Sequence, residues 1–195
     1  MIKKIKSYNS NNGIVLYPHA GGYAEQLYIK DLDVNVYGAI YPDSQIKFHK
    51  MCLKIAQSLH NEKIHEWYAI GSSMGGYVAF LVAHYYERYF NQAFKMLSLF
   101  GVGCPKELII KLNDNNFYSD VAPIDIAILK TLKINNKKVS APVILYISND
   151  EFFDSNKTIE FWSNITTNTV KLIYTEDQHL PSRDSLYNSF QELQF

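Results

Sequence analysis

In the stretch Tyr68-Ala-Ile-Gly71-Ser72-Ser73-Met74-Gly75-Gly76-Tyr77, one serine stands between two glycines at G-x-S-x-G spacing. A serine hydroxyl is a weak nucleophile unless the backbone holds it beside a base. Glycines on both sides allow a tight turn, which would present the Ser73 hydroxyl at the end of a strand. The pattern makes Ser73 a candidate nucleophile. The alternative is that Ser73 only occupies a tight strand-to-helix turn.

The residues on both sides of this turn have the periodicity that such a turn requires. Residues 67–70 are apolar, which is typical of a short buried strand. After the turn, apolar residues recur at the spacing of one helix face: Met74, Tyr77, Val78, Leu81, Val82 and Tyr85. The sequence therefore predicts a strand, a turn and a helix around Ser73.

Similar patterns extend along the whole chain. They predict strands over residues 13–18, 34–41, 94–100, 142–147 and 170–174. They predict helices over residues 48–59, 107–112, 124–132 and 159–162, and a C-terminal helix that carries Leu186, Phe190 and Leu193. Strands that alternate with helices indicate the α/β class, with a doubly wound, mostly parallel sheet. We find no repeat or linker and expect one domain over residues 1–195.

A nucleophilic serine needs a histidine base, which a carboxylate must orient. In α/β-hydrolases the three follow in the order serine, acid, histidine. His84 lies within the helix after Ser73 and would point away from the turn, whereas His179 follows the last predicted strand. We therefore expect His179 to be the base; the alternative is a histidine in a surface loop.

The acid should follow the preceding strand, where the sequence reads Ser148-Asn-Asp-Glu-Phe-Phe-Asp154. Asp150 is our choice because it comes first after the strand. Asp154 is an alternative that could instead cap the next helix, and Glu151 is a third. Glu176 and Asp177 lie close to the histidine in sequence and could compete for it.

Attack on an acyl group also needs donors for the developing oxyanion. The N–H of Met74, directly after the nucleophile, is one candidate. The other should come from the loop after the first predicted strand, Pro18-His-Ala-Gly-Gly22, whose glycines leave amides open. Ala20 N–H is our first choice and Gly21 N–H the second.

The composition is that of a folded chain. Of its 195 residues, 47% are hydrophobic and 19% are charged, and Lys+Arg and Asp+Glu both number 19. Zero net charge argues against nucleic acid and membrane partners. There is no apolar run of bilayer length, and Met1–Lys6 is a basic stretch without the apolar segment of a secretory signal. Cys52 and Cys104 have no metal-site spacing. We expect a cytoplasmic protein without a metal ion.

Two of these motifs together resemble a known family. Tyr17-Pro-His-Ala-Gly-Gly22 is similar to the oxyanion-loop signature of the type II thioesterases, the stand-alone α/β-hydrolases of polyketide and nonribosomal peptide synthesis. Gly71-Ser-Ser-Met-Gly-Gly76 resembles their nucleophile motif, with Ser72 in place of the usual histidine. Leu99–Pro105 resembles the entry to their lid, which would be a short lid of about residues 105–140 here.

The resemblance implies a serine hydrolase, without a cofactor, that removes acyl groups from the phosphopantetheine thiol of an acyl or peptidyl carrier protein. Ser73, His179 and Asp150 would form the triad. The same triad would also serve a carboxylesterase or an acyltransferase acting on small esters. A non-catalytic interaction protein on the hydrolase scaffold is the alternative of a different class.

Overall fold

The computed structural model describes residues 1–29, 32–42, 46–113, 123–134, 136–148, 153–177 and 179–193. The strands are β1 (Ile2–Lys6), β2 (Asn12–Tyr17), β3 (Asn35–Ala39), β4 (Glu66–Ser72), β5 (Met96–Phe100), β6 (Val143–Ser148) and β7 (Val170–Thr175). The helices are α1 (Phe48–His60), α2 (Met74–Phe90), α3 (Pro105–Leu112), α4 (Pro123–Leu129), α5 (Ser155–Ser163) and α6 (Arg183–Glu192), with a short 3₁₀ helix, η1 (Ala24–Leu27).

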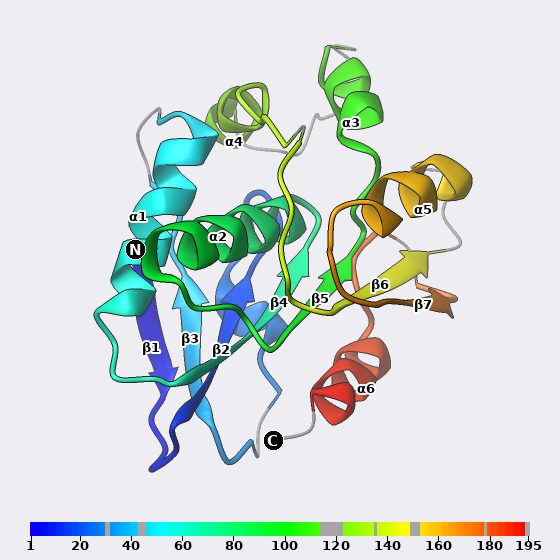
Figure 1. The fold of residues 1–195 in the computed structure, drawn as a ribbon. Coiled ribbons are helices and arrows are strands. Elements are labelled where there is room, and N and C mark those ends of the chain that lie inside the picture. The colour runs from blue at the N-terminus through cyan, green and yellow to red at the C-terminus, as the bar shows by residue number, and fades with distance from the viewer. Residues whose placement is uncertain are drawn as a thin grey trace.

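The described strands form one sheet in the order β1-β3-β2-β4-β5-β6-β7. All neighbouring pairs are parallel except β1 with β3. Figure 1 shows α3 and α4 beyond the arrowheads, at the carboxyl end of the central strands. The predicted α/β class with a mostly parallel sheet is confirmed. The loops after β2, β4, β6 and β7, which contain the candidate site residues, therefore lie at one edge of this sheet.

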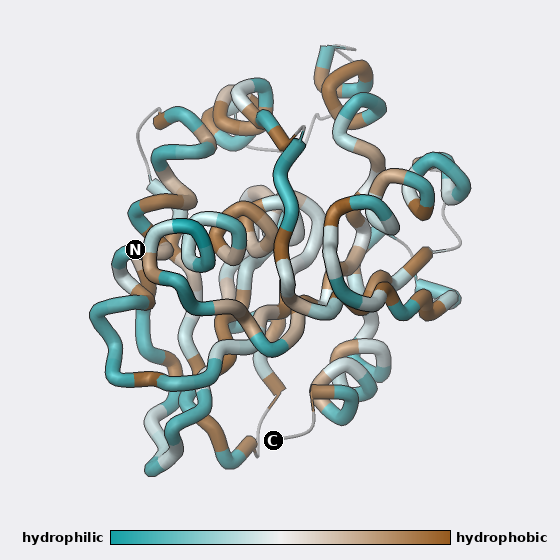
Figure 2. Tube along the Cα trace, viewed as in Figure 1, coloured by the Kyte–Doolittle hydropathy of each residue, from teal (hydrophilic) through white to brown (hydrophobic). Residues whose placement is uncertain are grey.

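Alternation along each strand produces two apolar layers. Val15 and Tyr17 of β2 face the layer that contains α1 and α2, whereas Ile14 and Leu16 face the layer that contains α6 and η1. Figure 2 shows hydrophilic and hydrophobic residues alternating along the outer helices, as expected of amphipathic helices. Among the described residues, no helix has both the length and the apolar character that crossing a membrane requires.

The predicted strands and helices occur, with ends that differ by a few residues. The exceptions are the short η1 and strand β1, which the sequence analysis did not predict. Strand β1 pairs antiparallel with β3 at the sheet edge, with Lys3 opposite Gly38 and Lys4 opposite Tyr37. Three lysines in five residues hide its strand pattern, although lysine is common on edge strands because it discourages further pairing.

Candidate active site

Ser73 occupies a strained turn between β4 and α2. Its backbone has φ of 52° and ψ of −119°, a conformation that residues with a side chain rarely adopt. The Ser73 N–H donates to the carbonyl of Phe100 at 2.8 Å, so β5 holds the turn in place. Such strain costs about 1–3 kcal/mol and persists where the surrounding structure imposes it. This is the geometry of a nucleophile elbow.

Gly75 brings the loop after β2 against the start of α2. A Cβ at this position would lie 2.0 Å from the carbonyl oxygen of Tyr17 and 2.5 Å from that of Pro18. No larger residue fits without moving that backbone. Because Met74 is the first residue of α2, its N–H has no acceptor within the helix. The Pro18–Gly22 loop, which we call the oxyanion loop, therefore lies beside a free helix N-terminus.

His179 reaches the serine from the loop between β7 and α6. Its Nε2 lies 2.7 Å from Ser73 Oγ, although 106 residues separate them in the chain. In the tautomer that leaves Nε2 unprotonated, the Ser73 hydroxyl donates to it. The structure thus brings together the nucleophile and the base that the sequence analysis chose. His84 instead contacts the carbonyl of Lys138 through Nδ1, at 2.8 Å.

Two residues that the sequence analysis did not assign to the site surround His179. A Cβ on Gly101, which has a φ of +56°, would lie 2.1 Å from the His179 carbonyl oxygen. Glycine at the end of β5 therefore allows the histidine loop to approach the sheet. The ring of Phe153 lies 6.0 Å from the imidazole, centroid to centroid. In the sequence, Gly101 directly follows a predicted strand, which marks a possible close approach of backbone. The sequence did not show that the His179 loop is what approaches.

The structure describes three of the five candidate acids. Asp150 and Glu151 lie outside the described residues. Asp154 caps α5, since its Oδ1 accepts from the N–H of Asn156 at 2.9 Å and of Lys157 at 3.1 Å. The Lys157 N–H bond is the main cause that lowers the pKa of Asp154.

Glu176 is exposed, whereas Asp177 is half-buried. The Oδ2 atom of Asp177 is buried without a hydrogen-bond partner among the described residues. Asp177 therefore stays an alternative to Asp150 as the acid that orients His179.

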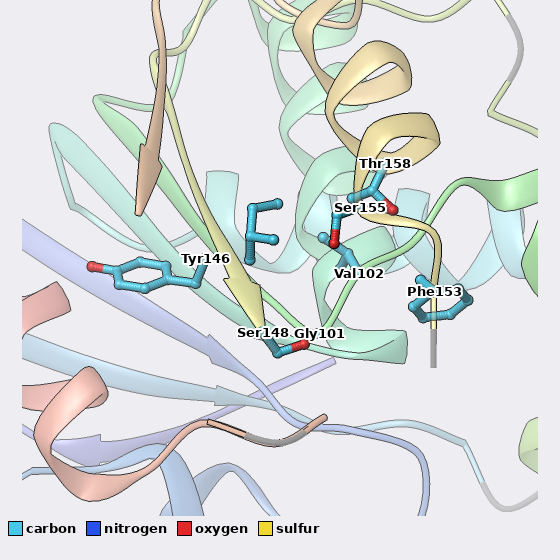
Figure 3. A pocket seen from close by; sticks show the side chains of 8 residues that line it. Gly101, Val102, Tyr146, Ser148, Phe153, Ser155 and Thr158 are labelled. Atoms are coloured by element: carbon cyan, nitrogen blue, oxygen red, sulfur yellow. The ribbon is translucent and has the colours of Figure 1, made fainter. Parts of the chain in front are cut away.

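A small cavity lies where β6 ends (Figure 3). Its volume of about 20 Å³ suits a single water molecule. Ser148 and Phe153, which flank residues 149–152, both line it, and so does Gly101. Gly101 also touches His179. Both ends of the segment that contains Asp150 therefore lie in the neighbourhood of the histidine.

Three hydrogen bonds hold the oxyanion loop. The Tyr41 hydroxyl donates to the Pro18 carbonyl at 2.8 Å. The Gly22 N–H donates to the His19 carbonyl at 3.0 Å and closes the turn. The Gly21 N–H donates to Oδ2 of Asp125, in α4, at 2.7 Å.

Of the two predicted loop donors, Gly21 thus already has an acceptor. The N–H of Ala20 donates to no residue in the described ranges. Burial lowers the pKa of His19, whose ring packs beside Gly22. That ring shapes the loop. Where the structure describes the chain, no three His, Cys, Asp or Glu side chains gather as metal ligands would.

Comparison with known proteins places this geometry in a known fold. No family model and no curated protein matches the chain. Among solved structures, the type II thioesterase BorB of the borrelidin biosynthetic cluster aligns with a TM-score of 0.74 at 15% identity, over 98% of this chain and 92% of BorB. The fold is that of the α/β-hydrolases.

Two further structures share this α/β-hydrolase fold. The thioesterase RedJ from the prodiginine pathway of Streptomyces coelicolor aligns with a TM-score of 0.72 at 17% identity, over 95% of this chain and 86% of RedJ. A lipase-esterase related protein from Clostridium acetobutylicum aligns with a TM-score of 0.69 at 14% identity, over 99% and 97% of the two chains. Structures that resemble this chain thus include a type II thioesterase, a member of the family that its motifs resemble.

Proposed function

We propose that this protein is a serine hydrolase that cleaves acyl thioesters presented on the phosphopantetheine arm of a carrier protein. The observation that carries the proposal is the 2.7 Å contact between His179 Nε2 and Ser73 Oγ on a strained strand-to-helix turn. A base within hydrogen-bond distance of a serine is what an activated nucleophile requires. In this proposal residues 1–195 form one domain, and residues 105–140 form a short lid over the site.

In the first half of the proposed reaction, Ser73 Oγ attacks the acyl carbonyl carbon and His179 Nε2 takes the hydroxyl proton. The carbonyl oxygen becomes an oxyanion, which accepts hydrogen bonds from the N–H groups of Met74 and Ala20. The C–S bond then breaks, and His179 returns its proton to the departing thiolate. The products are a free thiol and an acyl ester on Ser73.

In the second half, water attacks the acyl ester while His179 takes a proton from it. The bond to Ser73 Oγ breaks, His179 gives the proton back to the serine, and a carboxylic acid leaves. Throughout, a carboxylate holds the imidazole in the tautomer with Nε2 free. We assign that role to Asp150, because both flanks of its segment line the cavity next to Gly101.

The proposed thioester substrate rests on two independent likenesses. The Tyr17–Gly22 and Gly71–Gly76 motifs resemble those of type II thioesterases. Two of the structures with this fold are described as thioesterases from biosynthetic pathways. An esterase is the second candidate, because a lipase-esterase related protein also shares the fold. The triad chemistry is common to both, so only the leaving group separates them.

The function is tested by comparing release of thiol from an acyl-pantetheine thioester with release of alcohol from the matching oxygen ester. We expect a higher kcat/KM for the thioester than for the ester. A thiol reagent measures hydrolysis of the thioester, and release of acid measures hydrolysis of the ester. A preference for the ester would make the protein an esterase. Failure to hydrolyse either substrate, with Ser73 unreactive to a fluorophosphonate, would leave only the interaction-protein alternative.

A group of lysines lies within the segment of the proposed lid. Lys130, Lys133 and Lys138 are exposed, and none forms an ion pair with a described carboxylate. Lys137 instead packs 5.8 Å from the ring centroid of Tyr85.

The positive charge continues onto α1. Burial lowers the pKa of His49, and so do the charges of Lys47, Lys50, Lys133 and Lys137. We propose that this surface meets an acidic carrier protein.

Replacing Lys130, Lys133 and Lys138 with glutamine should lower kcat/KM on carrier-bound acyl groups roughly tenfold at low salt, because charge steers the encounter. Turnover of free acyl-pantetheine should be unchanged. The loss should shrink as salt is added.

The matched control replaces Lys63, Lys95 and Lys171, exposed lysines near the amino ends of β4, β5 and β7. This control makes the same change of charge and should leave both rates unchanged. Equal losses on both substrates in the first variant would instead mean a damaged lid.

A further inference from the structure

Asp125 links the segment of the proposed lid to the oxyanion loop. It lies in α4 with 7% of its surface exposed, and its Oδ2 accepts the Gly21 N–H at 2.7 Å across 104 residues of sequence. Asp125 and Gly21 also line one hollow of about 370 Å³ beside Tyr41. The reaction proposed above leaves this buried carboxylate without a role.

Burying the Asp125 carboxylate costs free energy that an apolar side chain at this position would not. Burial raises the pKa of Asp125, and the Gly21 hydrogen bond and the nearby His19 act against that rise. A buried carboxylate is unfavourable unless it is hydrogen-bonded. An apolar residue in this turn of α4 would avoid the penalty. The hydrogen bond from the Gly21 N–H is therefore the reason that a carboxylate lies here.

What it holds is the tip of the oxyanion loop. Gly21 has a φ of +74°, and a Cβ there would meet nothing within 4 Å. No side chain at Gly21 packs there, so the Gly21 end of the loop depends on its hydrogen bond to Asp125. Tyr41 anchors the Pro18 carbonyl on one side of Ala20, and Asp125 anchors the Gly21 amide on the other. Together with the turn bond from Gly22 N–H to the His19 carbonyl, these two anchors restrain the Ala20 peptide.

We propose that Asp125 is a positioning residue, a carboxylate on α4 that aims the Ala20 N–H at the oxyanion by holding the neighbouring Gly21 amide. This inference rests on the proposed function, since it assumes that an oxyanion forms next to Ser73. Asp125 itself does not touch the substrate. Because the oxyanion is common to every acyl substrate, its effect should not depend on the length of the acyl chain.

Asp125→Ala should lower kcat for acetyl-pantetheine about 10- to 100-fold while KM stays the same, because a misplaced donor weakens the transition state more than the substrate complex. The same fold-loss should appear with a long acyl chain. Asp125→Asn should recover most of the rate, since its amide oxygen can still accept the Gly21 N–H. The rate of fluorophosphonate labelling at Ser73 should fall in parallel.

Ile126→Ala is the matched control, because it weakens the packing of the same helix and leaves the carboxylate in place. If it reproduces the kinetics of Asp125→Ala, the effect is only loss of helix packing and the proposal is overturned. Wild-type rates in Asp125→Ala, or a change in KM alone, would overturn it too.

If the wild-type protein releases no thiol, the proposed thioester function fails. The labelling rate at Ser73 still tests Asp125 in that case, because the phosphonyl oxygen occupies the same oxyanion position. Labelling at an equal rate in wild type and Asp125→Ala would then overturn the inference by itself.

Discussion

Replacing Ser73 with alanine should abolish thioester hydrolysis, with a fall in kcat on the order of 10⁶, as expected when a triad loses its nucleophile. The reason is geometric: Ser73 Oγ lies 2.7 Å from His179 Nε2, and alanine has no atom for the imidazole to deprotonate. The measurement is thiol release, together with intact-mass detection of fluorophosphonate labelling. Both signals should vanish in Ser73→Ala.

The neighbouring serine supplies a matched control. Ser72 is completely buried, so a probe cannot reach its hydroxyl. Ser72→Ala should therefore be labelled once, at Ser73, at nearly the wild-type rate. Labelling at Ser72 in the Ser73→Ala protein, or an unlabelled wild-type protein, would remove the catalytic role proposed for Ser73.

The second large effect is expected at the acid. Asp150→Asn should lower kcat by a factor on the order of 10⁴ with little change in KM, because an amide holds the imidazole in the wrong tautomer. Steady-state kinetics on an acyl-pantetheine measure both constants. A loss in kcat alone would show that substrate binding is intact and that the transition state has lost its stabilisation.

Asp154→Asn is the control for this prediction. Asp154 bonds the first N–H groups of α5, and asparagine caps helices about as well as aspartate. Its activity should therefore be close to wild type. A reversed ranking would transfer the triad role to Asp154. Near-normal activity in both variants would point to Glu151, Glu176 or Asp177, and the buried Oδ2 of Asp177 makes it the one to test next.

The order of the elements could be predicted from the sequence because it depends on local patterns. Short apolar runs identified the central strands, and the spacing of Met74, Tyr77 and Val78 identified the helix after the serine. Edge strand β1 was not predicted because the residues of β3 that pair with it lie 30 to 37 positions away and because its lysines hide the pattern. Short-range periodicity contains no information about such a partner.

The residue types of the site were also predictable. A serine between glycines, a histidine after the last strand and glycines after the first predicted strand each have a local chemical reason. Their mutual distances were not predictable, because they depend on how the carboxyl ends of β2, β4 and β7 come together in one sheet. The 2.7 Å contact between Ser73 and His179 spans 106 residues.

The sequence by itself determined the α/β class and the identities of the candidate nucleophile and base, because periodicity and turn chemistry act between near neighbours. Only the tertiary structure decided that Gly101 makes room for the histidine loop and that Asp125 holds the Gly21 amide. Glycine at the end of a strand and aspartate in a short helix are common in any α/β chain. What distinguishes these two is a close approach between distant segments, and packing of the whole chain creates that approach.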